Sequence, residues 1–547
     1  MKKNLLILIL LAIWCCRVPL LAGDHNIRLN SLGFLPESSK QASINAACTQ
    51  FRIIESGTGK IMFEGRTSGP VFQKDVNENI WTADFSELTG PGKYFMEVPG
   101  VGRSADFPVG RQVYNEAYVT AMRGFYLWRC GTEVTGDHLG VRFHQDACHL
   151  HDGYEDYLGN PGQRRDGTGG WHDAGDYGKY VVNAGVTVGI LFMAWEQFRS
   201  DLKKIPLSIP ETAPGLPHFL QEMKWETDWL LKMQYPDGSG RVSHKLTAVS
   251  FEPFIMANAD ASKRYFTEWS SAATACFVAM MAQSARAFKP YDKAYAEKCL
   301  KAARLSWKFL KENPENKGFK QGDFKTGGYQ TNDPEDRLWA AAEMWETTGE
   351  KSFLEDFEKM AVKLKFRVAE NWDWGNQGNL GMFTYLLSDR KGKNKAVLDS
   401  ISEKCLNTAG LIVNKSIEDV YRRPFGGRYY WGCNGTVARQ VVNIYVANQL
   451  NPDPKYLEVA LDAIGHIFGR NYYNRSYVTG LGINPPMHPH DRRSGADGIA
   501  DPWPGYLVGG GHTATDWVDK EESYSHNEIC INWQAPLVFA LGWFVNP

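Results

Sequence analysis

The sequence predicts a mainly α-helical protein in which a ring of paired helices follows a small all-β sandwich. Three observations predict this fold. The 547 residues exceed one ordinary domain and favour two. Short alternating strands with turn signals fill roughly the first 110 residues. Beyond them, about ten segments carry helical periodicity, with long glycine- and aromatic-rich connections and no run of strands between them.

The N-terminus predicts export. Residues 1–23 have a positively charged start, a short apolar run and the small residues Ala22 and Gly23, which is the pattern of a cleaved signal peptide. The apolar run is too short to span a bilayer. A lipid anchor at Cys15 or Cys16 is the less favoured alternative, because a bulky tryptophan precedes them. No later segment looks membrane-spanning, so we expect a periplasmic or secreted protein.

Residues 24–110 predict the β-sandwich. The predicted strands lie at 27–30, 51–54, 60–63, 80–85 and 93–98. Glycine-rich turns separate several of them, and short strands at near-regular spacing favour a sandwich. Residue types that carry catalysis do not cluster here, so we expect a supporting or binding module.

Residues 111–547 predict an all-α domain. The expected helices cover 181–198, 217–233, 267–288, 291–312, 333–349, 351–370, 397–413, 435–449, 453–469 and 529–544. Two of them begin at an aspartate followed by proline, Asp333 and Asp453, and Gly349 ends the first. Helices paired around a ring suit a domain of this size, and its long loops would gather at one end and carry function.

Composition excludes several classes of function. The formal net charge of −2 gives no basic footprint for nucleic acid. The sequence lacks a phosphate-binding glycine loop, a dinucleotide fingerprint, a nucleophile elbow and a His-Glu-x-x-His motif. Aromatic residues reach 13%, which suits carbohydrate binding, although many of these rings are expected in the core. The ten cysteines form no recognisable disulfide framework, and buried free thiols are expected.

The glycine- and aromatic-rich stretch 169–180 carries two carboxylates, Asp173 and Asp176. Cleavage of a glycosidic bond needs one ionised carboxylate and one carboxylic acid. Asp173 and Asp176 are the candidates for the ionised carboxylate. Glu528 is the candidate acid, because it lies where a polar loop meets an apolar helix and partial desolvation raises a carboxyl pKa. Two alternatives stay open: a turn whose aspartates cap a helix, and a glutamate that stabilises a helix dipole.

Several motifs together resemble glycoside hydrolase family 9, the inverting β-1,4-glucanases. The segment 476–492 fits the family's first signature, and 517–528 fits the second, which departs downstream at Cys530 and Gln534. The segment 173–176 matches the family's base motif. The N-terminal region looks like the immunoglobulin-like domain that precedes one branch of the family.

The resemblance implies an (α/α)₆ barrel with its site at one end. Asp176 would be the general base, Asp173 would help to hold the attacking water, and Glu528 would be the general acid. The substrate-binding candidates are His490, Arg492, Asp519 and Tyr524, together with Trp431, an aromatic in a loop-like segment for which core packing is the alternative. A water must fit between base and sugar, which implies carboxyl groups about 6.5–9.5 Å apart and inversion at the anomeric carbon.

Cys130, Cys148, His149 and His172 are candidate zinc ligands. Two thiols and two imidazoles are enough to close a tetrahedral structural site. Their spacing matches no zinc finger, and simple burial of the cysteines is the alternative. The resemblance favours zinc, because zinc-bearing members of this branch place ligands at matching positions. Since His172 adjoins Asp173, such a zinc would brace the base loop.

Calcium is a weaker expectation. Glu335 and Asp336 align roughly with a calcium-binding pair in some relatives. Acids at a helix start more often serve the helix dipole, and that alternative is favoured here.

Three functions follow from these observations. The first is an inverting endo-β-1,4-glucanase that acts on cellulose-type, mixed-linkage or xyloglucan chains. The second uses the same barrel in an exo-acting hydrolase of cello- or glucosamine oligosaccharides. The third is a non-catalytic carbohydrate-binding protein, which is disfavoured because both carboxylate positions are filled. In each case the partner is a glucan-like saccharide, and we expect a monomer.

Overall fold

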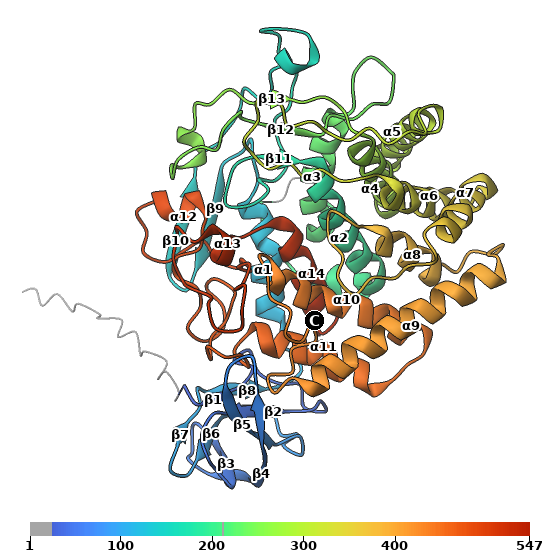
Figure 1. The fold of residues 1–547 in the computed structure, drawn as a ribbon. Coiled ribbons are helices and arrows are strands. Elements are labelled where there is room, and N and C mark those ends of the chain that lie inside the picture. The colour runs from blue at the N-terminus through green and yellow to red at the C-terminus, as the bar shows by residue number, and fades with distance from the viewer. Residues whose placement is uncertain (1–24, 211–212) are drawn as a thin grey trace, which may run out of the picture.

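The structure is a computed structural model that describes residues 25–210 and 213–547. The expected signal peptide over residues 1–23, with Cys15 and Cys16, lies outside the described residues. The described chain forms a β-sandwich, at the bottom of Figure 1, and a helical barrel above it.

The sandwich is built from antiparallel strands. They are β1 (Ile27–Arg28), β2 (Gln41–Ile44), β3 (Gln50–Glu55), β4 (Ile61–Gln73), β5 (Glu78–Asp84), β6 (Gly92–Val98), β7 (Gly102–Arg103) and β8 (Phe107–Val109). The long strand β4 serves both layers, because its first half pairs with β3 and its second half with β5. Phe34, Phe85 and Phe107 pack ring against ring in the core, with centroids 5.2, 5.4 and 5.5 Å apart.

Twelve helices of the described chain form two rings. The inner ring consists of α2 (Val181–Leu202), α4 (Ser271–Phe288), α6 (Pro334–Thr348), α8 (Gly378–Leu387), α10 (Cys433–Leu450) and α14 (Ile531–Gly542). The outer ring consists of α1 (Asn115–Leu127), α3 (His218–Met233), α5 (Lys293–Glu312), α7 (Lys351–Lys363), α9 (Lys395–Glu418) and α11 (Pro454–Ile467). Each inner helix contacts the next, and α14 contacts α2, which closes the ring. This is the predicted (α/α)₆ barrel.

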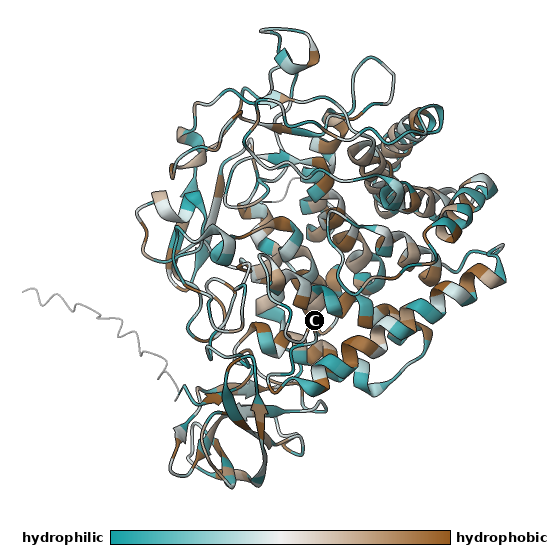
Figure 2. Cartoon of the chain, viewed as in Figure 1, coloured by the Kyte–Doolittle hydropathy of each residue, from teal (hydrophilic) through white to brown (hydrophobic). Residues whose placement is uncertain are grey.

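The amino-acid sequence of each helix explains whether it lies in the inner or the outer ring. The inner helices α2, α4, α10 and α14 are buried around nearly their whole circumference. The outer helix α5 buries only a stripe of residues three or four apart, from Tyr295 to Leu310. In Figure 2, α5, α7 and α9 alternate between teal and brown, as amphipathic helices do. Helix α2 is long and apolar enough to cross a membrane, but 89% of its most apolar stretch is buried in the barrel, as in a core helix.

All six inner helices begin at the same end of the barrel. The chain alternates between the two rings, so successive inner helices run in the same direction. The segments that lead into α2, α6, α10 and α14 therefore meet at one end, and they contain the aspartate loop and Glu528. Helix N-termini also favour negative charge, which suits a site built from carboxylates.

The structure differs from the prediction in several elements. Helices α1 and α8 were not expected, because glycines interrupt their apolar periodicity and α8 is short. The prediction of no strands among the helices is wrong. Short strands occur at β9 (Val134–His138), β10 (Val141–Gln145), β11 (Lys179–Tyr180), β12 (Lys245–Thr247) and β13 (Tyr265–Phe266), too brief to show alternation. Short helices α12 (Arg492–Ala496) and α13 (Tyr524–Asn527) and the 3₁₀ turns Asp156–Leu158 and Ala257–Ala259 complete the described elements.

Buried polar contacts join the sandwich to the barrel. Arg28 and Glu78 of the sandwich form an ion pair of 2.6 Å, and the hydroxyl of Tyr421 donates to the same carboxylate at 2.6 Å. Arg470 of the barrel donates to the Ser43 hydroxyl at 3.1 Å. Buried charged groups of this kind must stay paired, so these contacts fix the orientation of the two parts.

Candidate active site

The aspartate loop before α2 is held by backbone contacts with two distant segments. The Ile531 N–H donates to the Asp173 carbonyl at 2.9 Å, and the Arg492 N–H donates to the Gly175 carbonyl at 3.2 Å. A Cβ on Gly175 would lie 2.1 Å from the His490 carbonyl oxygen, so only glycine fits. His490 in turn forms a β-bridge with Glu528. Segments far apart in the sequence are thereby brought together.

Asp176 presents one oxygen to the site. Its Oδ2 accepts hydrogen bonds from the Gly178 N–H at 3.0 Å and from the Tyr180 hydroxyl at 2.9 Å. In the described chain no hydrogen bond uses its Oδ1. The residue is 5% exposed, so Oδ1 is the atom with which a water can interact.

Asp173 is buried and firmly oriented. Its Oδ1 accepts from the Asn183 side chain at 2.7 Å, and its Oδ2 accepts from the Tyr329 hydroxyl at 2.5 Å. Burial, with a smaller contribution from the charge of Asp176, raises the pKa of Asp173 to about 8, although both hydrogen bonds act in the opposite direction. The two aspartates therefore have different environments: each oxygen of Asp173 already accepts one hydrogen bond from the protein, whereas Oδ1 of Asp176 accepts none in the described chain.

Glu528 has the environment of a general acid. It lies between α13 and α14, within the electrostatic reach of both aspartates. Burial and the charges of Asp176 and Asp173 raise the pKa of Glu528 well above its usual range, while Arg492 and a hydrogen bond from Trp431 act against this rise. A carboxyl group in this setting keeps its proton at pH values at which an exposed glutamate has lost it.

The predicted substrate-binding residues surround Glu528. Trp431 and Tyr524 are 45% and 54% exposed, with ring centroids 5.4 Å apart in a T-shaped pair. His490 donates from Nδ1 to the Glu521 carbonyl at 2.6 Å, which leaves Nε2 free to accept a sugar hydroxyl. Burial is the largest of the causes that lower the pKa of His490.

Arg492 and Asp519 are largely occupied by the protein. Arg492 donates from Nη1 to the Gly175 carbonyl at 2.8 Å and pairs through Nε with Glu252 at 3.0 Å. The Asp519 carboxylate accepts from Arg475 at 3.0 Å and from three further donors of the adjoining loops. We therefore expect Asp519 to shape the subsite through the loops that it holds. Direct contact of either residue with a sugar stays a prediction.

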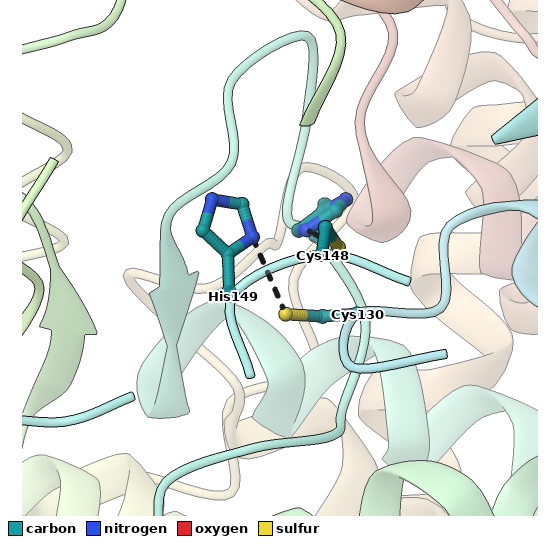
Figure 3. Close-up of side chains that lie close together, drawn as sticks. Cys130, Cys148 and His149 are labelled. Atoms are coloured by element: carbon teal, nitrogen blue, oxygen red, sulfur yellow. Dashed lines mark hydrogen bonds between the residues drawn. The ribbon is translucent and has the colours of Figure 1, made fainter. Parts of the chain in front are cut away.

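The four predicted metal ligands form one cluster. The ligand atoms of Cys130, Cys148, His149 and His172 all lie within 4.8 Å of one another, and the cluster is almost wholly buried. Figure 3 shows Cys130, Cys148 and His149 converging, with the Cys130 sulfur 3.6 Å from Nδ1 of His149. The Cys148 sulfur is 3.7 Å from Nε2 of His172. Asp260 accepts from the outer nitrogen of His149 at 3.1 Å, as carboxylates do behind metal-bound histidines.

Comparison with known proteins identifies the family. The model of glycosyl hydrolase family 9 matches residues 114–541, and the model of the cellulase N-terminal immunoglobulin-like domain matches residues 22–103. The chain belongs to glycosyl hydrolase family 9. The predicted family and fold class are thereby confirmed.

Close relatives within family 9 cover most of the chain. Endoglucanase D of Acetivibrio thermocellus is 54% identical over 96% of this chain and 84% of its own length. A xyloglucan-specific endo-β-1,4-glucanase of Bacteroides ovatus is 31% identical over 96% of this chain and 95% of its own length. The crystal structure of a zinc-binding triple mutant of a family 9 endoglucanase, J30, superposes with a TM-score of 0.87 at 31% identity and covers 94% of this chain and 99% of that chain.

The proposed calcium pair looks different from the cysteine–histidine cluster. Glu335 lies 3.6 Å from Arg367, while Asp336 is 2% exposed and burial raises its pKa well above the usual range. Among the described residues, only the cysteine–histidine cluster brings three or more ligand atoms of His, Cys, Asp or Glu together. Calcium at this family 9 chain stays a prediction.

Sequence reasoning missed the residues that orient the aspartates. Tyr180 and Asn183 follow Asp176 by four and seven positions, and their place at the entry of α2 was the available signal. Tyr329 reaches Asp173 from 156 positions away, and only its place before α6 could have indicated it. In this family 9 chain one tyrosine hydroxyl therefore reaches Asp176 from the same stretch of sequence, and the other reaches Asp173 from a distant loop.

Proposed function

We propose that this family 9 chain is an endo-β-1,4-glucanase that hydrolyses β-glucan by single displacement with inversion. The observation that carries the proposal is the meeting of Asp176 and Glu528 at one end of the barrel. Oδ1 of Asp176 accepts no hydrogen bond in the described chain, and burial raises the pKa of Glu528 well above its usual range. The endoglucanase names of the relatives support the same activity.

The proposed reaction uses the two carboxyl groups once each. Asp176 accepts a proton at Oδ1 from a water molecule while the water oxygen bonds to the anomeric carbon. Glu528 gives its proton to the glycosidic oxygen as the bond from that oxygen to the anomeric carbon breaks. Asp173, held by Asn183 and Tyr329, orients the water. The reaction consumes one water, and proton exchange with solvent restores both carboxyl groups.

The products test this proposal directly. We expect NMR of a fresh digest of a β-1,4-glucan to show the α-anomer first, because water attacks the face opposite to the leaving group. Chain-length analysis in the first minutes should show a range of oligosaccharides. Release of only mono- or disaccharide from the start would instead support the exo-acting alternative, and binding without hydrolysis would support a carbohydrate-binding protein.

Replacement of Glu528 by glutamine tests the general acid. Wild-type activity should fall as pH rises through the elevated pKa of Glu528, because the acid then loses its proton. Glu528→Gln should lower kcat on β-glucan by roughly 10²–10⁴-fold and remove this alkaline limb. A substrate with a dinitrophenyl leaving group needs little proton donation, so its hydrolysis should fall far less. An unchanged alkaline limb in the variant would mean that another group donates the proton to the glycosidic oxygen.

The substrate class follows from the exposed aromatic pair and the relatives. Trp431 and Tyr524 offer apolar ring surface beside Glu528, which suits the C–H faces of glucose units. We infer an unbranched β-1,4-glucan as the preferred chain, with xyloglucan as a second candidate because one relative carries that specificity in its name. Initial rates on cellulose, mixed-linkage glucan and xyloglucan separate these possibilities.

We infer that the cysteine–histidine cluster holds a zinc ion. Two thiolates and two imidazoles fit a closed tetrahedral site, whose edges would be about 3.3–3.8 Å for ordinary Zn–S and Zn–N bonds. The distances of 3.6 and 3.7 Å between the ligand atoms agree with this geometry. Bound zinc would supply structural cross-linking and no reactive position for water, since all four positions would be filled. Its effect on catalysis would pass through His172, the neighbour of Asp173.

We further propose that the protein is exported and acts as a monomer. The proposal of export rests on the charged and apolar pattern of residues 1–23. Fractionation of cells between cytoplasm, periplasm and medium tests it, and sedimentation tests the oligomeric state.

A further inference from the structure

Lys245 is a buried lysine that the proposed reaction leaves unused. It lies on β12, opposite Tyr180 of β11, and is 0% exposed. Its Nζ donates to the Gln321 side chain at 2.7 Å, to the Gly327 carbonyl at 2.8 Å and to the Thr326 hydroxyl at 3.3 Å. None of these acceptors is a carboxylate. A buried ammonium without an ionised hydrogen-bonding partner is unfavourable for folding, so its presence needs another explanation.

Aromatic rings complete the surroundings of this ammonium. Its Nζ lies 4.8 Å from the ring centroid of Phe324, 5.2 Å from that of Phe319 and 5.7 Å from that of Tyr180. Ring faces attract a cation within about 6 Å. Together with three uncharged acceptors, they favour a charged Lys245 without neutralising its field.

A short chain of contacts leads from Lys245 to Asp176. Lys245 holds the Gly327 carbonyl, and the Gly327 N–H donates to the Tyr180 hydroxyl at 3.1 Å. The Tyr180 hydroxyl donates its single hydrogen to Oδ2 of Asp176 at 2.9 Å. Burial and the charge of Asp176 raise the pKa of Tyr180 well above its usual range, so the hydroxyl keeps this hydrogen. The relay therefore holds Oδ2 and leaves Oδ1 of Asp176 for the water.

Electrostatics connects the same two residues. Burial lowers the pKa of Lys245 to about 7, and the charge of Asp176 is the cause that acts against this decrease. Three titratable groups face Lys245: Asp176 of the aspartate loop, Tyr180 of β11 and His244 of its own segment. The residues that face it from the opposing segment do not titrate; they are Phe319, Gln321, Phe324, Thr326 and Gly327. His244 is buried and its pKa is lowered to about 3, chiefly by burial, so it adds no charge at neutral pH.

We propose that Lys245 is a positioning residue that sets the orientation and the working pH range of the base Asp176, through the Gly327–Tyr180 relay and through its own positive charge. The proposal deepens the proposed function and rests on Asp176 as the base. Lys245 is buried and donates to protein groups, so it acts through Asp176 and not on the sugar. Its ammonium places a positive charge near the base, and its hydrogen bond to Gly327 fixes the hydroxyl that orients the carboxylate.

Lys245→Met tests the proposal with a side chain of similar length and no charge. We expect the acid limb, the low-pH side of the pH profile of kcat/KM, to move to higher pH by about half a unit or more, because the ionised base loses a nearby positive charge. At the pH optimum kcat should fall about tenfold while KM changes less than about twofold, since the residue acts on the base and not on the sugar.

A matched control lies in the sandwich. Lys40 is also 0% exposed, and its Nζ donates to three carbonyl oxygens, of Pro36, Ser38 and Ser86, at 2.7, 2.8 and 3.2 Å. Lys40→Met removes an equally buried ammonium far from the site. It should lower the melting temperature as Lys245→Met does and leave the acid limb and kcat unchanged.

The relay is tested separately with Tyr180→Phe. If the hydroxyl transmits part of the effect, the losses of kcat in Lys245→Met and Tyr180→Phe should be non-additive. The double variant should then have a kcat close to that of the less active single variant. Gln321→Glu gives a second route in case Lys245→Met does not fold. Its new carboxylate would pair with the ammonium and reduce the field at Asp176, so the acid limb should move in the same direction.

The outcomes separate this proposal from the proposed function. A Lys245→Met enzyme with the wild-type acid limb and kcat, together with an unchanged acid limb in Gln321→Glu, would overturn the role of Lys245 even if Asp176→Asn is inactive. Activity retained in Asp176→Asn would overturn the proposed base and with it this inference. A shifted acid limb in both Lys245→Met and Gln321→Glu, absent in Lys40→Met, supports the proposal.

Discussion

Asp176→Asn is expected to lower kcat on β-glucan by roughly 10²–10⁴-fold, because the amide cannot accept the proton of the attacking water. The variant keeps the size of the side chain and an oxygen that can accept from Gly178 and Tyr180. We therefore expect a change in the free energy of unfolding below about 1 kcal/mol. Single-turnover rates and a thermal melt measure the two quantities on one sample.

Asp137→Asn is the matched control for this variant. Asp137 is an exposed carboxylate on the β9–β10 hairpin, 3.4 Å from Arg142, and in the described chain no hydrogen bond or ion pair joins its side chain to the aspartate loop. Its replacement removes the same charge from the surface and should leave kcat unchanged. A second comparison is Asp173→Asn. Its loss of activity should have more than one cause, since the substitution also disturbs the hydrogen bonds from Asn183 and Tyr329. Turnover close to wild type in Asp176→Asn would contradict the assignment of the base.

Cys130→Ser is expected to abolish zinc binding and to destabilise the protein by about 3–5 kcal/mol, because a buried cluster loses one of its four ligands. The thiolate is the stronger zinc ligand, and serine cannot replace it at neutral pH. Metal content by mass spectrometry should fall from about one zinc per chain to none. The melting temperature should fall with it, and treatment of the wild type with a strong chelator should have the same effect.

Cys405→Ser separates the metal from the mere loss of a buried thiol. Cys405 lies on α9, is 1% exposed and belongs to no ligand cluster in the described chain. The Cys405→Ser variant should retain zinc and lose far less stability than Cys130→Ser. If Cys130→Ser kept both its zinc and its melting temperature, the cluster would be a set of buried free thiols and histidines. A fall in kcat that follows zinc loss would indicate that His172 transmits the effect to Asp173.

The sequence predicted most of the barrel because its helices carry local signals. Asp333 with Pro334 and Asp453 with Pro454 start α6 and α11, and the αL conformation of Gly349 ends α6. Helix α8 was missed because ten residues with two glycines give too few turns to show a period. Neighbouring structure stabilises it instead, since it packs between α6 and α9.

The candidate site could be predicted where its chemistry is local or where a family motif marks a distant residue such as Glu528. Asp173 and Asp176 stand three residues apart, so their motif is visible in one stretch of sequence. The contact of Tyr329 with Asp173 depends on closure of the ring, which no local pattern encodes. The same holds for Lys245, whose burial against 319–327 follows from the pairing of β12 with β11. Long-range contacts of this kind arise from tertiary packing and not from propensity.

The order of the inner helices has a consequence for the timing of activity during synthesis. The proposed base, Asp176, precedes α2, the first helix of the inner ring, and the proposed acid, Glu528, precedes α14, the last. Contact between α2 and α14 is the step that completes the ring and brings both carboxyl groups to one place. A nascent chain in which α14 has not yet docked therefore has the proposed base without a positioned acid, and we expect it to stay inactive until α14 joins the ring.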